Sequence, residues 1–163
     1  MDLFDSHCHL QDARLEPDLG GVMLRARANR VANLVCCGTR PSDWAKVHAL
    51  ACKHEGVIPA YGVHPWYADD AVDSAWEAEL RAYLEADPVA GVGEIGLDGA
   101  IRPRNLEQQQ VLFMRQLRLA EELGRVVSVH CRRAWQPLLD VLHGADALPE
   151  GVLIHSYSGS VEL

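Results

Sequence analysis

Apolar runs alternate with amphipathic stretches along almost the whole chain of 163 residues. Six mostly continuous apolar, β-rich runs predict strands at 3–8, 31–38, 57–64, 88–97, 125–131 and 151–159. Such continuous runs are typical of parallel strands that are buried on both faces. Between them, apolar residues recur at helical spacing around 19–26, 44–51, 76–84, 106–120 and 135–142. This alternation predicts an α/β fold with a parallel sheet.

Several residues at the ends of the helical stretches match common start and stop signals. Ser42 and Ser74 stand where an N-cap is expected, and Glu77 completes a capping-box pattern with Ser74. Gly56 and Gly124 follow helical stretches, and Gly124 has the C′ position that favours glycine. These signals predict helices that begin after the two serines and end before the two glycines.

Length and composition indicate one soluble globular domain over residues 1–163. Hydrophobic residues make up 48% of the chain, which is enough for a sizeable core. No apolar run approaches the ~18–20 residues that a membrane span needs, and the N-terminus lacks the pattern of a secretory signal. We therefore expect no membrane partner.

Cysteine usage indicates the cellular location of the protein, and net charge limits the kind of partner it can bind. The five cysteines are odd in number and contain no C-x-x-C pair, so they do not form a disulfide framework. We expect a reducing, cytoplasmic location. A formal net charge of −8 argues against a protein that coats nucleic acid through bulk electrostatics. It does not exclude an enzyme that handles phosphates locally, because bound metal ions can supply positive charge.

Metal-binding side chains recur at the carboxyl ends of the predicted strands, namely His7, His9, His64, Glu94, His130 and His155. In an open doubly wound sheet, ligands gather at one switch point that few strands reach. A closed barrel instead brings all of its strand ends to one mouth. The distribution of these residues therefore favours a (β/α)8 barrel over an open doubly wound sheet.

The number of predicted strands is too small for a complete barrel. A (β/α)8 barrel needs eight strands and typically ~250 residues, whereas this chain supplies six predicted strands in 163 residues. We expect a single domain of the barrel type that lacks its C-terminal β/α units. Two open sheet edges and an uncovered apolar interior would then favour self-association.

The first and fourth predicted strands carry the strongest single signals. Side chains two apart on a strand share a face, so His7 and His9 can reach one metal ion while Cys8 faces the other way. The alternative is that backbone carbonyls satisfy both imidazoles. Glu94 lies in the apolar, glycine-rich run GVGEIGLD, where a buried carboxylate is costly unless it is paired or bound to a metal. The alternative there is a salt bridge to an arginine.

His130 and His155 extend the same pattern to two further strands. Arg132 shares the strand face of His130, and its planar guanidinium suits phosphate oxygens, although an arginine that caps the barrel rim is the alternative. His64 precedes a proline that starts a turn, so we favour a substrate contact for it over metal ligation. Asp98 is a candidate for orienting a ligand or a substrate water, or it caps a loop.

The donor types limit the metal and its chemistry. Imidazoles with a carboxylate and no thiolate suit Zn²⁺, Mn²⁺, iron, Co²⁺ or Ni²⁺, and less readily Mg²⁺. Four imidazoles and one carboxylate are too many for a single catalytic ion that keeps an open position. Two ions bridged by Glu94 account for all five donors. Such a pair lowers the pKa of a bound water and stabilises both oxygens of a displacement at phosphorus, so the site predicts metal-assisted hydrolysis.

Five segments of the chain carry a family resemblance, namely DSHCHL, GVHPW, GEIGLD, VHCRRA and IHSYSGS. Their order and spacing are those of the TatD-like metal-dependent deoxyribonucleases. The whole chain resembles this family. The resemblance implies an amidohydrolase-type TIM-barrel hydrolase with two divalent ions (Mg²⁺, Mn²⁺ or Zn²⁺). It implies action on DNA ends or single strands, often as a 3′-5′ exonuclease. It also implies that His7 and His9 bind one ion, that Glu94 bridges, and that His130 and His155 bind the second.

Two features depart from the family pattern. The family has a further aspartate after its last strand, in a segment resembling E-T-D-x-P, which completes the first metal site and acts on the nucleophilic water. The chain ends before any such segment. The position after Arg132 is commonly acidic in the family, whereas here it is Arg133. Relatives that use a modified lysine as the bridge are excluded, because the only lysines, Lys46 and Lys53, fall on a predicted helix.

Three functional hypotheses follow. The leading one is a two-metal phosphodiesterase that acts on DNA, with Glu94 as the bridging catalytic residue and with His64, Asp98 and Arg132 as substrate contacts. The second is a small-molecule amidohydrolase or lactonase with the same metal pair, which the net charge of −8 favours. The third is an inactive truncated fragment. Arginines near the predicted strand ends favour phosphate, namely Arg102, Arg104, Arg132 and Arg133.

Overall fold

One parallel sheet of six strands forms the centre of the protein, with the strand order β1-β2-β3-β4-β5-β6. The computed structural model describes residues 1–71, 75–102, 105–145, 148–149 and 151–162. The strands are β1 (Leu3–Cys8), β2 (Val31–Cys37), β3 (Val57–Tyr61), β4 (Gly91–Asp98), β5 (Val127–Arg132) and β6 (Val152–Ile154). The helices are α1 (Leu19–Ala28), α2 (Pro41–Lys53), α3 (Ala75–Ala86), α4 (Leu106–Glu122) and α5 (Trp135–His143), with short 3-10 helices η1 (Glu16–Asp18) and η2 (Pro65–Tyr67).

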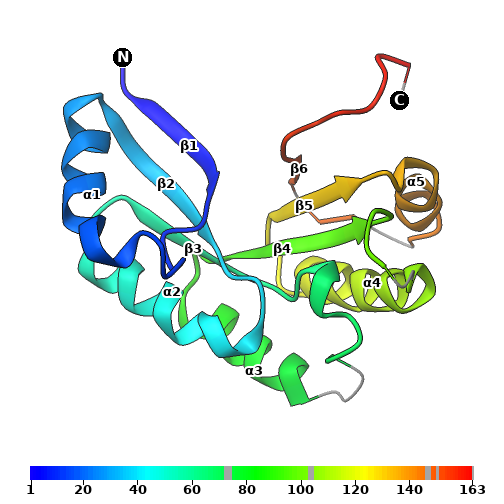
Figure 1. The fold of residues 1–163 in the computed structure, drawn as a ribbon. Coiled ribbons are helices and arrows are strands. Elements are labelled where there is room, and N and C mark those ends of the chain that lie inside the picture. The colour runs from blue at the N-terminus through cyan, green and yellow to red at the C-terminus, as the bar shows by residue number, and fades with distance from the viewer. Residues whose placement is uncertain (72–74, 103–104, 146–147, 150, 163) are drawn as a thin grey trace.

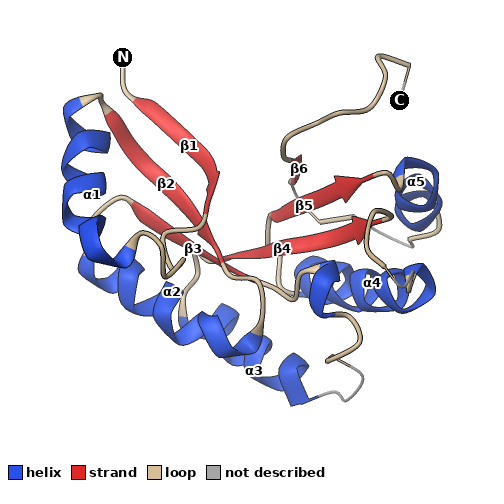
Figure 2. Ribbon diagram, in the orientation of Figure 1, coloured by secondary structure: helices blue, strands red, loops and turns tan. Residues whose placement is uncertain are grey.

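The sheet is curled, and the helices lie along its outer side (Figures 1 and 2). Every strand pairs in parallel with its neighbour in sequence. An open doubly wound sheet requires a reversal of strand order at a switch point, and this sheet has none. The prediction of a (β/α)8-type barrel with six units is therefore confirmed. β1 and β6 form the two edges of this partial barrel.

The core between sheet and helices is made of large apolar side chains, as continuous apolar strands predict. Trp44 of α2 is fully buried, as are Leu80 of α3 and Phe113 of α4. The indole nitrogen of Trp44 donates to the carbonyl of Gly62 at 3.0 Å, so its polar atom is satisfied. These contacts attach each helix to the outer face of the sheet.

The inner face of the curled sheet is apolar near the amino ends of the strands and is open to solvent. A cavity of about 340 Å³ lies there, lined mainly by Phe4, Val35, Ile58, Val92, Val127, Val152 and Leu153. The edge residues Leu3 and Phe4 remain 50% and 55% exposed. The uncovered interior and open edges expected from the strand count are therefore present in the described part of the chain.

Several details differ from the sequence predictions, among them the predicted strand 57–64, which ends at Tyr61. The N-cap at Ser42 is wrong, because Pro41 takes the first helical position and Arg40 is the cap residue. The Asp43 carboxylate accepts hydrogen bonds from the Thr39 backbone N–H and hydroxyl instead. The predicted strand 151–159 is also too long, because the chain turns after Ile154 and Ser156 has φ +48°. The predicted cap at Ser74 lies outside the described residues.

Gly124 follows α4 with φ +62°, and the predicted stop signal is confirmed there. Gly96 in β4 has φ +134°, and a Cβ at this position would lie 2.1 Å from the carbonyl oxygen of His130. Only glycine accommodates both the dihedral angle and the close approach. A side chain at this position would therefore collide with β5, two residues after Glu94 and at the level of His130. No helix in the described residues is long and apolar enough to cross a membrane.

Candidate metal centre

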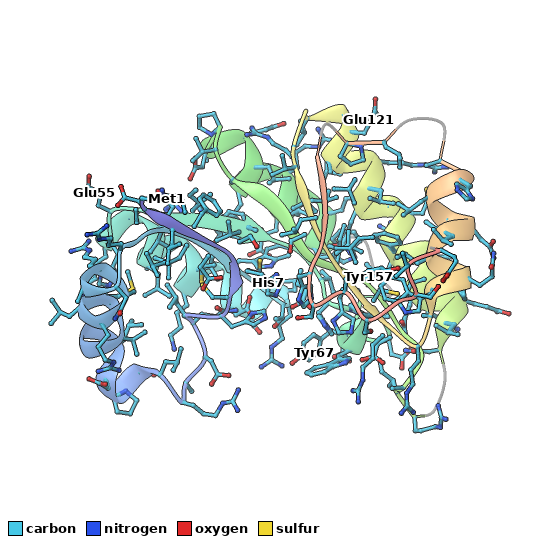
Figure 3. The ribbon with its side chains drawn as sticks, turned by 90° about the horizontal axis from the view of Figure 1, so that it is seen from above. Met1, His7, Glu55, Tyr67, Glu121 and Tyr157 are labelled. Carbon is cyan, nitrogen blue, oxygen red and sulfur yellow. The ribbon has the colours of Figure 1, made fainter. Side chains whose placement is uncertain are left out.

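The carboxylate of Glu94 lies at the carboxyl ends of the strands and is surrounded by five imidazoles. Its side chain comes from the fully buried strand β4, and the residue is only 3% exposed. In Figure 3, Met1 marks the amino end of β1 and His7 marks its carboxyl end, toward the middle of the molecule. Residues from β1, β5 and the segments after β1, β3 and β6 meet at this point.

The two oxygens of the Glu94 carboxylate face different histidines. Oε2 lies 3.3 Å from Nε2 of His7 and 3.1 Å from Nε2 of His9. Oε1 lies 2.9 Å from Nδ1 of His130, 2.7 Å from Nε2 of His155 and 3.3 Å from Nε2 of His64. No arginine pairs with this carboxylate within the described residues. The sequence-predicted histidines thus come together around one carboxylate, as barrel convergence requires.

Two overlapping groups of three side chains in this cluster have the size of a metal site. They are His7, Glu94 and His155, and His64, Glu94 and His130, with ligand atoms within 4.8 Å of one another in each. The rings of His7 and His155 are stacked with centroids 3.7 Å apart. Nε2 of His7 faces one oxygen of Glu94 and Nε2 of His155 faces the other. Neutral imidazole is the form that binds a metal ion.

The hydrogen-bond partners of His9 indicate whether a cation fits between His9, His7 and Glu94. Its Nδ1 lies 2.8 Å from the carbonyl oxygen of Cys37, and because a carbonyl only accepts, Nδ1 carries the proton. The Nε2 lone pair of a neutral His9 then faces Oε2 of Glu94 and also Nε2 of His7, 3.3 Å away. Facing lone pairs repel unless a cation or a proton lies between them. This donor set therefore fits a divalent metal ion.

His130 is held between two carboxylates. Its Nδ1 faces Glu94, and its Nε2 lies 3.3 Å from Oδ2 of Asp98. When Nε2–H donates to Asp98, the Nδ1 lone pair points to the Glu94 side, the arrangement in which an outer carboxylate orients a metal-binding histidine. Asp98 is 2% exposed and also accepts from the Ala100 N–H at 2.8 Å. The structure thus places Asp98 behind His130 and at the start of a loop.

His64 has a different hydrogen-bonding role in this cluster. Its Nδ1 accepts the backbone N–H of Trp66 at 3.1 Å, so the proton of the neutral ring lies on Nε2, the atom that faces Glu94. Burial lowers the pKa of His64 more than its hydrogen bond to Glu94 raises it, which keeps the ring neutral. A neutral His64 donates toward an oxygen atom and has no lone pair for a metal at that nitrogen. This geometry favours the predicted substrate contact over metal ligation.

Burial by itself raises the pKa of Glu94, but hydrogen bonds from His130, His155, His64 and His7 outweigh this effect and lower the pKa well below its usual range. Glu94 is therefore ionised at neutral pH. When His9 is protonated, its Nε2–H donates to Glu94, and this hydrogen bond raises the pKa of His9 above its ordinary value, although burial opposes this shift.

The two candidate ligand groups among the described residues contain no cysteine. Burial raises the pKa of Cys8 to about 12 and the pKa of Cys36 and Cys131 to about 11. Burial also raises the pKa of Cys37, whose sulfur lies 3.4 Å from Nδ1 of His7. The donors are therefore nitrogen and oxygen, as the sequence predicts.

The cluster opens into a cavity of about 570 Å³ whose walls carry both charged and aromatic side chains. The lining residues other than the cluster are Gln11, Asp12, Ala13, Arg14, Thr39, Arg40, Asp43, Trp66 and Tyr67. Arg14 is paired with Asp12 at 2.6 Å. Arg132 is exposed at the end of β5 and is not among the lining residues. Arg104 lies outside the described residues.

Two supporting residues were not singled out from the sequence. Ser128 lies 2.8 Å from Nδ1 of His7 through its hydroxyl, and Gln11 donates to the Cys37 carbonyl at 2.6 Å. Each stands two residues from a cluster histidine, Ser128 before His130 and Gln11 after His9. For Ser128, which lies on β5, the period of two along a strand was a usable signal. A serine or glutamine alone gives no reason to prefer a metal centre over a core.

Comparisons of the sequence and of the fold with known proteins point to one family. A family model described as TatD related DNase matches residues 4–163. The chain is 34% identical to a 3′-5′ ssDNA/RNA exonuclease TatD of Cronobacter sakazakii, over 97% of the chain and 60% of that protein. It is 30% identical to the uncharacterized metal-dependent hydrolase YabD of Bacillus subtilis, over 99% of the chain and 63% of that protein. The crystal structure of YjjV, a TatD homologue from Escherichia coli, superposes with a TM-score of 0.90 at 33% identity and covers 98% of the chain and 62% of YjjV. The chain thus spans about three fifths of the length of these relatives.

Proposed function

Because this chain belongs to the TatD related DNase family, we propose that it is a divalent-metal-dependent hydrolase that cleaves phosphodiester bonds of DNA and removes nucleotides from a 3′ end. One observation carries the proposal: a buried, ionised carboxylate lies within 3.3 Å of five imidazole nitrogens. Such a cluster is expensive to bury without a metal.

The division of contacts between the two Glu94 oxygens supports a two-ion site. His7 and His9 would hold one ion and His130 and His155 would hold the other, with Glu94 shared between them. Divalent ions in such a pair supply an activated water and stabilise negative charge on phosphate oxygens. Glu94 is the bridging residue, and its low pKa keeps it charged for this role. The ions we propose for this pair are Mg²⁺, Mn²⁺ or Zn²⁺.

Residues of the chain around the ions position the reacting groups. His64 directs its Nε2–H into the cluster, where it can donate to a substrate oxygen that displaces Glu94 as its partner. Asp98 holds the ring of His130, which makes it a positioning residue. Arg132 stays a proposed phosphate contact from its place at the end of β5, for a substrate that extends beyond the cavity. The cytoplasmic location also stays a prediction.

The experiment is a cleavage assay on the 163-residue chain with a 5′-labelled single-stranded oligonucleotide in Mg²⁺, Mn²⁺ or Zn²⁺, and with EDTA as the metal-free reference. We expect metal-dependent shortening by one nucleotide at a time from the 3′ end. His130→Ala should abolish cleavage, whereas His143→Ala, at an exposed histidine at the end of α5, should not. Equal cleavage by His130→Ala contradicts the assignment of the site.

The same assay separates the alternatives. Internal fragments indicate an endonuclease, and hydrolysis of a lactone or amide without DNA cleavage indicates the small-molecule hydrolase that the net charge of −8 favours. Metal binding without hydrolysis of any substrate indicates that the 163 residues hold a metal centre but not a working active site.

A further inference from the structure

Trp66 is a large aromatic side chain that is held rigidly and yet remains exposed. It lies in η2, directly after His64 and Pro65, and it is 57% exposed while lining the cavity that contains Glu94. Single exposed aromatic residues are common on protein surfaces and need no explanation by themselves. This one is unusual because both of its anchors belong to the metal centre.

The first anchor is Asp98, whose Oδ2 accepts the indole N–H of Trp66 at 2.8 Å. The second anchor is His64, whose ring lies 4.7 Å from the indole at an interplanar angle of 70°. The backbone N–H of Trp66 also donates to Nδ1 of His64. These contacts fix the plane of the indole beside the cluster without covering it. An aromatic surface that is already ordered loses little conformational entropy when a ligand binds to it.

We propose that Trp66 is a stacking platform for a nucleobase of a single-stranded DNA substrate. This inference rests on the proposed function and adds the element that recognises the nucleotide. Base–aromatic stacking tolerates every base, because each base has a π-face. A paired base is held in the stack by its partner strand, whereas an unpaired 3′-terminal base can rotate out of the stack and present a face to the indole. The platform therefore selects unpaired ends rather than a sequence.

A cation on the same rim of the cavity suits the backbone phosphates of such a strand. The guanidinium of Arg40 lies over the ring of Tyr67, the residue after Trp66, at 4.8 Å from the ring centroid. Within the described residues no carboxylate pairs with this guanidinium, in contrast to Arg14, which is paired with Asp12. An aromatic surface beside an unpaired cation is the combination that single-strand binding sites use.

The test compares a single-stranded oligothymidylate with the same strand carrying an abasic 3′-terminal nucleotide. Binding is followed in EDTA by the fluorescence anisotropy of a dye on the 5′ end of each strand, with tryptophan quenching as a second readout, and kcat/KM is measured with metal. Stacking should favour the strand with the base by about 5- to 150-fold in the wild type. Trp66→Leu should bind both strands equally. Trp66→Phe should keep most of the preference, although it loses the N–H that contacts Asp98.

Controls separate stacking from a merely structural role. Trp135→Phe should retain the fluorescence quenching on binding, because Trp135 packs against Tyr157 away from the cavity, whereas Trp66→Phe should lose most of it. If Trp66 only supports Asp98, Trp66→Leu lowers kcat/KM for both strands by the same factor, and the inference is overturned.

Failure of the inference is also distinguishable from failure of the proposed function. Cleavage with an unchanged base preference in Trp66→Leu overturns the stacking role alone. Base-dependent binding without cleavage overturns the nuclease alone, and the absence of both binding and cleavage overturns both.

Discussion

Replacing Glu94 by glutamine removes the charge at the centre of the metal site and nearly preserves its shape. The carboxylate is the only acid within 3.3 Å of all five imidazole nitrogens among the described residues. An amide keeps one oxygen but has no negative charge, and its NH₂ group cannot bind a cation. We expect Glu94→Gln to fold with the same secondary structure and to lose most of its affinity for divalent metal.

The size of the effect follows from ligand linkage. An ion present at about 100 times its Kd stabilises the folded state by about 2.7 kcal/mol. For a domain of this length, each 1 kcal/mol moves Tm by about 2–4 °C, so saturation of one site should raise Tm of the wild type by about 5–11 °C. We expect a rise of less than about 2 °C in Glu94→Gln at the same ion concentration, because little binding energy remains.

The assay is scanning calorimetry in EDTA and in increasing Mn²⁺, with the metal content measured independently for each variant. Glu122→Gln is the matched control, because Glu122 is an exposed glutamate that pairs with Arg81 at the end of α4, a helix on the outer side of the sheet (Figure 1). It should retain the full Mn²⁺ effect. An equal Mn²⁺ effect on Tm in Glu94→Gln and in the wild type would refute the reasoning that this carboxylate organises the metal centre.

Three further predictions concern the surroundings of the site and the sheet edges. Gly96→Ala should lower the free energy of unfolding by about 1–3 kcal/mol or more, because the new side chain combines a strained dihedral angle with a contact of 2.1 Å to the His130 carbonyl. Urea denaturation measures this loss. An unchanged urea midpoint would show that β4 and β5 can separate freely. Asp98→Asn should weaken metal binding about 10- to 100-fold in titration calorimetry, because His130 loses the charged partner of its Nε2. An unchanged metal affinity would show that Asp98 does not support the metal centre. Light scattering over a range of concentrations should detect self-association through the exposed edges β1 and β6, and a monodisperse monomer at every concentration would contradict it.

The sequence predicted the fold class and the cluster well because both depend on short-range periodicity. The period of two puts His7 and His9 on one strand face, and continuous apolar runs mark buried parallel strands. The glycines around Glu94 mark a place where backbones approach closely, and Gly96 has that role against His130. Chain order then determines which strands are neighbours, since every strand of the described sheet pairs with the next in sequence.

The predictions that failed depended on competition between adjacent signals. Ser42 is a good N-cap residue, but Pro41 fits the first helical position and Asp43 reaches back to the Thr39 backbone N–H, so the helix begins earlier. The apolar run 151–159 reads as a strand throughout, but Ser156 takes a positive φ and the chain leaves the sheet after Ile154.

By itself, the sequence determined that histidines and one carboxylate end the strands of a parallel, barrel-type sheet. Only the tertiary structure decided which imidazole nitrogen faces which oxygen of Glu94, that Asp98 lies behind His130, and that Trp66 is anchored at the mouth of the cavity. The physical reason is that strand periodicity sets the side to which a residue points. The distances and hydrogen-bond partners depend on how the strands curl and on where each loop turns.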